Sequence, residues 1–378
     1  MFRVLSVFLV VLSGINFYIA HRLSAGLKQL LPWLGTGVLF AILTGLTVLT
    51  MLGFARSMLP LGDGFKKFLG IFFAWWLGLF MYLAIYTVVS EPLWLAAKLA
   101  RLASPERLAR IRSLGILVLT AATVLWGGIH ARQIRHITYE VPLDACTREV
   151  QEMNIVLISD VHLGAIGSEG RMEAIVQRIN ALEPDLVCIA GDFFDSDFLS
   201  ISDPDRARET LLKLKATHGI YACLGNHDAG ATYPQMAEFL ESCSIRCLKE
   251  EYVVVADQLI LAGRLDASPI GGFGGLTRQK DFRIINEEDL PVIILDHNPA
   301  RADQYGDEID LVLSGHTHKG QIFPGSLITG RMYTVDHGHY RPESGPQVVV
   351  TSGVGYWGMP LRIGTDCEIV TIRLVSGN

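Results

Sequence analysis

The chain has 378 residues, enough for two or more domains, and half of them (50%) are hydrophobic. Its net charge of -6 provides no global basic field, so we expect no nucleic-acid partner. The six cysteines form no CxxC pair, which argues against a disulfide framework. Most of the apolar excess lies before residue 130.

The first part of the chain has the composition of a membrane region. Four apolar runs occupy residues 4–20, 33–55, 68–89 and 114–129. The middle two contain no Asp, Glu, Lys or Arg and are long enough to cross a hydrocarbon core of about 30 Å. The first run also resembles a signal sequence, but no small-x-small cleavage pattern follows it, so we expect it to be retained. The sequence therefore predicts a transmembrane region with four helices over residues 1–130.

The orientation of these spans in the cell membrane stays open. Lys and Arg residues divide equally between the two sides, so the positive-inside rule does not discriminate. The segment 91–114 reads as a basic amphipathic interfacial helix, which favours the cytoplasm for the side opposite the carboxy-terminal part. Ionisable residues are nearly absent from the spans, and this favours an anchor over an ion or substrate pathway.

From about Met153 onward, strand and helix patterns alternate. Three strand-then-helix units with nearly continuous apolar strands predict a sheet that is covered on both faces. Six later strands have few helices between them, which predicts a second, mixed sheet and hence a layered α/β sandwich. We assign residues 131–150 to a connector and residues 151–378 to a catalytic domain.

Polar residues follow five of the predicted strands directly. These residues are Asp160 and His162, Asp192 and Asp195, Asn226 and His227, His297, and His316 and His318. The strand ends of an open α/β sheet converge on one crevice. Clustered carboxylates repel one another there unless cations intervene, and mixed nitrogen and oxygen ligands suit Mn, Fe or Zn. The pattern therefore predicts a site for divalent metals.

Each of these motifs is weak by itself. Asp, Asn and Gly are ordinary turn residues, and a single loop histidine is more often solvated or hydrogen-bonded than a ligand. Five such groups in succession, each at a strand end, are not expected by chance. The combination carries the prediction.

The series DxH, GDxxD, GNHD, an apolar run ending in His, and GHTH resembles the calcineurin-like metallophosphoesterase superfamily over residues 153–374. Within this superfamily, the four apolar runs and the stretch GHTHKGQ are similar to the membrane-associated YkuE/YaeI-like phosphodiesterase group. This resemblance implies a four-layer α/β/β/α sandwich and a centre of two divalent metal ions (Mn, Fe or Zn). The implied ligands are Asp160, His162 and His318 for the first metal, Asn226, His297 and His316 for the second, and Asp192 bridging the two.

The resemblance also implies catalytic roles for two residues that are not ligands. His227 matches the family's histidine near the leaving group, and Asp195 matches the carboxylate that orients it. A dimetal centre lowers the pKa of a bridging water and clamps the oxygens of an in-line displacement at phosphorus. A histidine outside the ligand set can protonate the leaving group.

These inferences point to a membrane-anchored phosphoesterase that attacks phosphodiester or pyrophosphate bonds with a metal-bridged hydroxide. The membrane bilayer is one expected partner, and the substrate is expected to be phosphorylated and amphiphilic, with UDP-2,3-diacylglucosamine as the specific candidate. Family grounds lean towards a cytoplasmic catalytic domain, against the lean of segment 91–114. The alternative is a membrane transport or sensing protein whose esterase-like domain only binds a ligand.

Two further residues are weaker candidates for substrate binding. Lys319 stands where the related group commonly has glycine, and its ammonium could neutralise a second phosphate or could simply be solvated. Arg362 matches a recurring arginine of the group and could reach a phosphate or form a structural ion pair. The glycine cluster at 271–275 lacks the strand-to-helix context of a phosphate loop, and we expect a flexible loop, with a lid over the cleft as one role.

Overall fold

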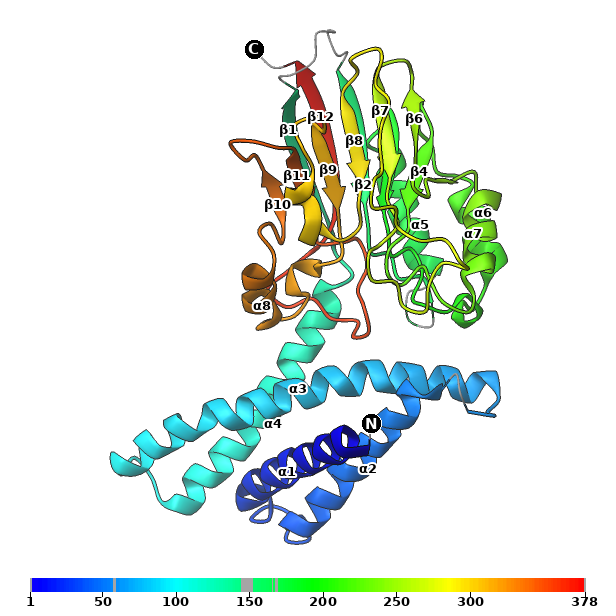
Figure 1. Ribbon diagram of the computed structural model, residues 1–378. Helices are drawn as coiled ribbons and strands as arrows, with labels where there is room; N and C mark the ends of the chain where they lie inside the picture. Colours follow the sequence, from blue (N-terminus) through cyan, green and yellow to red (C-terminus); the bar gives the residue numbers. More distant parts are fainter. Residues whose placement is uncertain (1, 57–58, 144–151, 165, 167–168, 377–378) are drawn as a thin grey trace. The chain divides into compact units, whose positions relative to one another are not determined.

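The computed structural model describes all residues except 1, 57–58, 144–151, 165, 167–168 and 377–378 (Figure 1). The chain divides into two units, a helical unit of residues 1–129 and a catalytic unit of residues 130–378. Each is described below by itself.

The helical unit consists of four helices that are long and apolar enough to cross a membrane. They are α1 (Phe2–Leu27), α2 (Thr36–Phe54), α3 (Asp63–Leu99) and α4 (Pro105–His130). The prediction of four spanning helices is thus confirmed in number, but α1, α3 and α4 extend beyond the apolar runs. Helices continue past the first charged residue because Lys, Arg and Glu are good helix formers and can place their charged ends in water.

This extension brings ionisable side chains into the helix packing. The Glu91 carboxylate of α3 accepts a hydrogen bond from the Tyr18 hydroxyl of α1 at 2.8 Å and lies 2.8 Å from Arg22 Nε. Arg112 of α4 approaches the same carboxylate at 3.4 Å. Deeper in the unit, Asn16 donates to the Thr47 hydroxyl at 3.1 Å. The helices are therefore joined by polar contacts as well as by apolar packing.

The catalytic unit contains two six-stranded sheets. The first has the order β1 (Ile134–Leu143), β12 (Cys367–Ser376), β2 (Met153–Ile158), β3 (Leu186–Ala190), β4 (Ile220–Cys223) and β5 (Arg246–Cys247). The second has the order β10 (Gly338–Tyr340), β11 (Gln347–Val350), β9 (Leu311–Ser314), β8 (Val292–Leu295), β7 (Leu259–Gly263) and β6 (Glu251–Val255). Strands β2 to β5 are parallel to one another, as are β7, β8, β9 and β11. Strand β12 is antiparallel to β2 and parallel to β1, and the edge strands β6 and β10 are antiparallel to their neighbours.

The two sheets pack face to face over a core of aliphatic side chains from both, including Ile155, Leu261 and Leu313. The outer face of the first sheet is covered by α5 (Glu169–Asn180), α6 (Pro204–Leu211) and α7 (Tyr233–Ser242). The outer face of the second is covered by the short 3₁₀ helix η3 (Pro299–Gln304) and by coil. The predicted four-layer arrangement is confirmed, with a thin fourth layer. Continuous apolar strands suit this position because both faces of each sheet are buried.

One boundary differs from the prediction. Residues 134–143 of the predicted connector form β1, which pairs in parallel with β12 along its whole length, from Ile134 opposite Cys367 to Leu143 opposite Ser376. Residues 144–150 of that connector lie outside the described part of the chain. From Ile137 to Leu143 the more buried and the more exposed residues alternate, as expected for a half-exposed strand at the edge of a sheet.

Candidate metal centre

The carboxyl ends of five parallel strands from both sheets place the candidate ligands together. Each of these strands (β2, β3, β4, β8 and β9) is buried at every position or all but one, and a polar residue follows within three residues of its end. The resulting side chains form groups whose ligand atoms lie within 4.8 Å of one another: Asp160, His162 and His318; Asp192, His297 and His316; and His162, Asp195 and His227.

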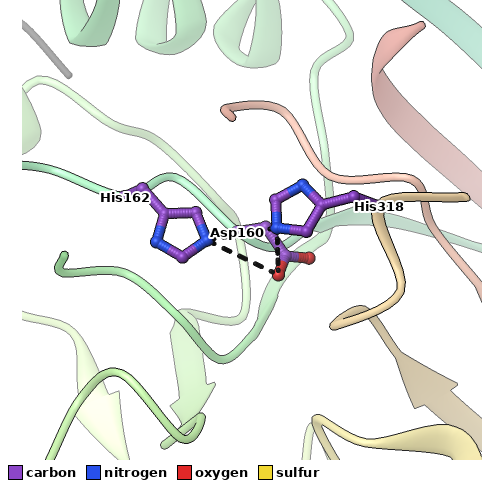
Figure 2. Close-up of side chains that lie close together, drawn as sticks. All are labelled: Asp160, His162 and His318. Atoms are coloured by element: carbon purple, nitrogen blue, oxygen red, sulfur yellow. Dashed lines mark hydrogen bonds and ion pairs between the residues drawn. The ribbon is translucent and has the colours of Figure 1, made fainter. Parts of the chain in front are cut away.

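The first group combines one carboxylate and two imidazoles (Figure 2). Asp160 Oδ1 lies 3.3 Å from His318 Nε2 and 4.0 Å from His162 Nε2. The two Nε2 atoms are 3.2 Å apart, and the two rings are stacked at a centroid distance of 5.2 Å. All three side chains are buried. One carboxylate and two imidazole nitrogens that converge on one point are a donor set that suits a divalent cation such as Zn or Mn.

The second group lies next to the first. Asp192 Oδ2 is 3.1 Å from His297 Nε2, and His316 Nδ1 is 3.2 Å from His297 Nε2 and 2.9 Å from Asn226 Oδ1. His297 Nδ1 donates to the Ala190 carbonyl at 2.7 Å, so Nε2 is the nitrogen directed at Asp192. Although burial alone would lower it, the charge of Asp192 raises the pKa of His297 well above its usual value, and a cation at Nε2 would take the place of that proton. Asp192 Oδ2 also lies 3.9 Å from His162 Nε2. This one carboxylate therefore faces both groups, the position that a bridging ligand requires.

The environment keeps most of these imidazoles neutral. Burial lowers the pKa of His162 to about 3 and that of His316 to about 4, and it lowers the pKa of His318 well below its usual value. Burial also raises the pKa of Asp160 to about 6, with the charge of Asp192 adding to the effect. Neutral imidazoles offer the lone pairs that metals need, and a nearby cation would stabilise the negative charge of the buried carboxylates. The donor set thus fits two divalent metals.

The backbone at the centre is strained in a way that fits a built site. The candidate ligands Asp160, His162, Asp192, His316 and His318 all have φ values between 48° and 70°, in the left-handed region. Such conformations cost about 1–3 kcal/mol each for residues other than glycine and concentrate at functional sites. Close approach adds a second constraint, since a Cβ at Gly225 would overlap the Asp192 carboxylate.

His227, the predicted catalytic residue, lies at the rim of the first group. Its backbone N–H donates to Asp192 Oδ1 at 2.8 Å, and its ring packs edge-on against His162 at 5.1 Å. Its Nδ1 is hydrogen-bonded to the Ser196 hydroxyl at 2.5 Å. Asp195, the predicted orienting carboxylate, lies within the same cluster and 3.9 Å from His162 Nδ1. Sequence reasoning missed Ser196, although it directly follows Asp195.

Arg362 occupies a place that the substrate-binding prediction did not anticipate. It is fully buried, and its guanidinium donates to the carbonyls of His318 at 3.0 Å, Ser352 at 2.7 Å and Gly355 at 2.6 Å. Its Nη2 is also 3.2 Å from His318 Nδ1. Neither the predicted phosphate contact nor the alternative ion pair describes this environment. Arg362 instead contacts the backbone and the ring of the candidate ligand His318.

Lys319 follows His318 in the short 3₁₀ helix η4 (His318–Gly320), with a left-handed backbone at φ 51°. Its N–H donates to the Thr317 hydroxyl at 3.1 Å, and the residue is half-buried. The structure therefore places Lys319 at the edge of the centre, where the predicted phosphate contact stays a prediction.

Asp266 is a carboxylate near the centre that sequence reasoning missed. The preceding residue, Leu265, forms a parallel bridge with Leu224, which brings Asp266 beside the Gly225–Asn226 turn. The side chain is 2% exposed, Oδ1 accepts from Ser268 N at 2.7 Å, and Oδ2 has no partner among the described residues. Burial raises its pKa, the charge of Asp192 adds to this effect, and the charge of Asp266 in turn raises the pKa of His297. The signal was available, because "LILAGRLD" is another apolar strand that ends in a carboxylate.

The glycine-rich segment at 271–275 is anchored, contrary to the expectation of a flexible loop. Ile270 N donates to the Asn226 carbonyl at 3.0 Å, and Gly230 N donates to the Gly272 carbonyl at 2.8 Å. Phe273 is buried against Tyr233. Beyond the glycines, Arg278 binds both carboxylate oxygens of Asp296 at 2.8 and 2.6 Å, directly before His297.

Known proteins share this combination of motifs and fold. The family model described as calcineurin-like phosphoesterase matches residues 153–320. A Danio rerio transmembrane protein with metallophosphoesterase domain is 34% identical over 68% of this chain and 61% of its own length. An uncharacterized metallophosphoesterase of Helicobacter pylori is 32% identical over 67% of this chain and 68% of its own.

A more distant relative is the UDP-2,3-diacylglucosamine pyrophosphatase of Chlamydia trachomatis, 25% identical over 58% of this chain and 83% of its own length. The match thus spans less than two thirds of the Danio rerio protein but more than two thirds of the two bacterial ones. From its sequence, its sandwich fold and its strand-end residues, the chain belongs to the calcineurin-like phosphoesterase family.

Proposed function

We propose that the chain is a membrane-anchored, metal-dependent hydrolase of phosphodiester or pyrophosphate bonds. The observation that carries this proposal is the position of Asp192, whose carboxylate faces His297 at 3.1 Å and His162 at 3.9 Å. A carboxylate between two groups of imidazoles is suited to joining two cations at one centre. Asp160, His162 and His318 would hold one cation, and Asn226, His297 and His316 the other.

Two bound divalent cations supply Lewis acidity towards phosphoryl oxygens and activation of water. The remaining chemistry belongs to the chain's own residues. His227 stands beside the centre without being needed as a ligand, so its imidazole can give a proton to the departing oxygen. The hydrogen bond between the Ser196 hydroxyl and Nδ1 holds the orientation of that ring. The exposed Trp357 ring, 5.8 Å from His227, borders the space in which a leaving group would lie.

Two observations support a class of substrate: the helices that precede the candidate metal centre and the name of one relative. Four helices capable of crossing a membrane precede it, and one relative is named as a pyrophosphatase of a diacylated nucleotide sugar. We therefore infer a phosphorylated amphiphile, with UDP-2,3-diacylglucosamine as the first candidate to assay. Anchoring in the cell membrane would keep the enzyme at the surface where such molecules reside.

Hydrolysis of bis-p-nitrophenyl phosphate by the full chain, with added Mn²⁺, tests the reaction class. Wild-type protein should release nitrophenol, and Asp192→Asn should lose at least about 10²-fold in kcat because the charge shared by both groups is gone. Asp197→Asn is the matched control, since this aspartate only caps the exposed 3₁₀ helix η2 (Phe198–Ser200). Wild-type activity no higher than that of Asp192→Asn would refute the proposal.

A further inference from the structure

Helix α8 (Gly325–Met332) carries apolar side chains that the protein itself does not cover. No residue of this helix is buried. Leu327 is 52% exposed, Ile328 59% and Met332 68%. Arg331 adds an exposed positive charge on the same helix. We refer to Leu327, Ile328, Met332 and Arg331 as the α8 surface.

The α8 surface is held rigidly at the rim of the metal centre. The helix begins seven residues after His318, and the next residue after it, Tyr333, packs its ring against His316 at 6.2 Å. The Asp336 side chain accepts from the Thr329 hydroxyl at 2.9 Å, and its carbonyl accepts from the Thr317 hydroxyl at 2.6 Å. In Figure 1, α8 lies at the end of the catalytic unit towards which β8 and β9 point. Both ends of the helix are therefore tied to ligand-bearing segments.

A short helix whose apolar side chains are all exposed is unusual in a protein that is surrounded by water alone. Isolated helices of fewer than about 12 residues are marginal, and helices in proteins owe most of their stability to a packed apolar face. α8 has eight residues and no such packing. Its combination of aliphatic side chains with arginine is typical of segments that lie in the surface of a bilayer.

The chain itself brings a bilayer to this part of the molecule. His130 closes α4, a helix that can cross a membrane, and Ile134 opens β1. Ile134, the first residue of β1, pairs with Cys367, the first residue of β12. Because β12 is antiparallel to β2, β1 begins at the end of the sheet where β2 ends and is followed by Asp160 and His162. Residues 131–133 alone therefore separate a membrane-spanning helix from the edge that carries the ligands.

We propose that the α8 surface lies in the surface layer of a lipid bilayer, so that the metal centre opens onto substrates held in that layer. The contact with lipid stands on the structure alone; its consequence for turnover rests on the proposed function. Leu327, Ile328 and Met332 enter the boundary between headgroups and acyl chains, and Arg331 pairs with lipid phosphate.

A fluorescent probe in the full chain tests the contact without relying on activity. The nitrobenzoxadiazole fluorophore is attached at Ile328→Cys, or at Ile285→Cys as the matched control, in a Cys146→Ser background. Ile285 is an equally exposed isoleucine (68%) in the segment between β7 and β8, and the described cysteines are all buried. Each protein is reconstituted in vesicles of phosphatidylcholine and phosphatidylglycerol, with and without lipids carrying a nitroxide on the acyl chain.

The proposal expects blue-shifted emission and about a twofold loss of fluorescence with nitroxide lipid at position 328, and neither change at position 285. Equal behaviour at both positions would overturn it. A blue shift at 328 without quenching by the lipid would also overturn it, because the surface would then be covered by protein.

A second measurement follows the consequence for turnover. Ile328→Asp should hydrolyse soluble bis-p-nitrophenyl phosphate at the wild-type rate but lose about tenfold in turnover of UDP-2,3-diacylglucosamine presented in vesicles, while Ile285→Asp keeps both rates. If probe 328 is quenched and wild type cleaves neither substrate, the proposed function fails and the lipid contact stands. If wild type cleaves both and Ile328→Asp is unaffected on vesicles, the delivery role fails.

Discussion

His162 and His318 direct their Nε2 atoms at each other across 3.2 Å, although 156 residues separate them in the chain. Burial lowers the pKa of both rings, so the neutral pair can share only the Nε2–H of one ring. A cation bound between the rings would take the place of that proton, and Asp160 and Asp192 flank this position with negative charge.

Arg362→Lys tests whether the buried guanidinium positions His318. A lysine keeps the charge but cannot donate at once to the carbonyls of His318, Ser352 and Gly355. We expect the affinity for one of two Mn²⁺ ions to fall by about 10–100-fold, as is usual for lost supports of metal ligands. Equilibrium dialysis against Mn²⁺ measures this directly. The control is Arg373→Lys, an exposed arginine of β12, and equal affinities of the two variants would contradict the role.

Ser196→Ala removes the hydroxyl that holds His227 Nδ1. Because His227 is assigned to proton transfer and not to metal binding, we expect kcat to fall by about tenfold, equivalent to one hydrogen bond, with unchanged metal content. The kcat of His227→Gln should fall further, by about 10²–10⁴-fold. A p-nitrophenolate leaving group, which hardly needs a proton, should reduce both losses compared with an alkyl leaving group. A loss of metal in Ser196→Ala would show that the residue acts elsewhere.

Asp266→Asn tests the carboxylate whose Oδ2 lacks a partner. The substitution keeps the Oδ1 contact with Ser268 N and removes the charge that acts on His297. We expect about 10–100-fold weaker binding of the second Mn²⁺, because outer carboxylates orient and strengthen metal ligands. Calorimetric titration with Mn²⁺ resolves the two sites. Asp310→Asn, a partly buried aspartate that caps Val292 N at the far end of β8, should bind both ions normally.

Glu368→Gln links the stability of the catalytic unit to pH. Burial alone would raise the pKa of Glu368, but hydrogen bonds from His337, Ser352 N and Thr351 lower it below its ordinary 4.5. A lowered folded-state pKa contributes stability that is complete above pH 4.5 and is lost as the pH falls through the folded value. The free energy of unfolding of the variant should therefore be lower by about 2–4 kcal/mol at pH 7, and it should fall less than that of wild type on acidification. Thermal unfolding from pH 7 to pH 3 would refute this if both proteins lost stability in parallel.

Much of the fold can be predicted from the sequence because most strands are continuous runs of apolar residues. Runs such as Ile293–Leu295 and Leu311–Leu313 have no exposed side, and only a sheet covered on both faces provides that environment. The edge strand β1 and the exposed helix α8 lack such a continuous apolar run. The apolar runs of the sequence are shorter than helices α1, α3 and α4, because charged residues also belong to these helices; Glu91 and Arg112, for example, pair inside the helical unit.

The candidate ligand side chains lie together as the sequence predicts, since each comes within four residues of the end of a strand. Their supporting contacts could not be predicted in this way. Arg362 reaches His318 across 44 residues, and Ser196 reaches His227 across 31. Such pairs depend on how the two sheets face each other, which no local pattern encodes. Lys319 and the assignment of each ligand to one of two metals stay predictions.

The number of metal ions that activity requires tests the central claim most directly. Metal-free full chain is titrated with Mn²⁺ while bound metal per chain and hydrolysis of bis-p-nitrophenyl phosphate are followed together. The account predicts that two ions bind, that activity rises only with the second, and that Asp192→Asn loses both high-affinity binding and turnover. Full activity at one ion per chain, or two ions bound with wild-type affinity by Asp192→Asn, would contradict it.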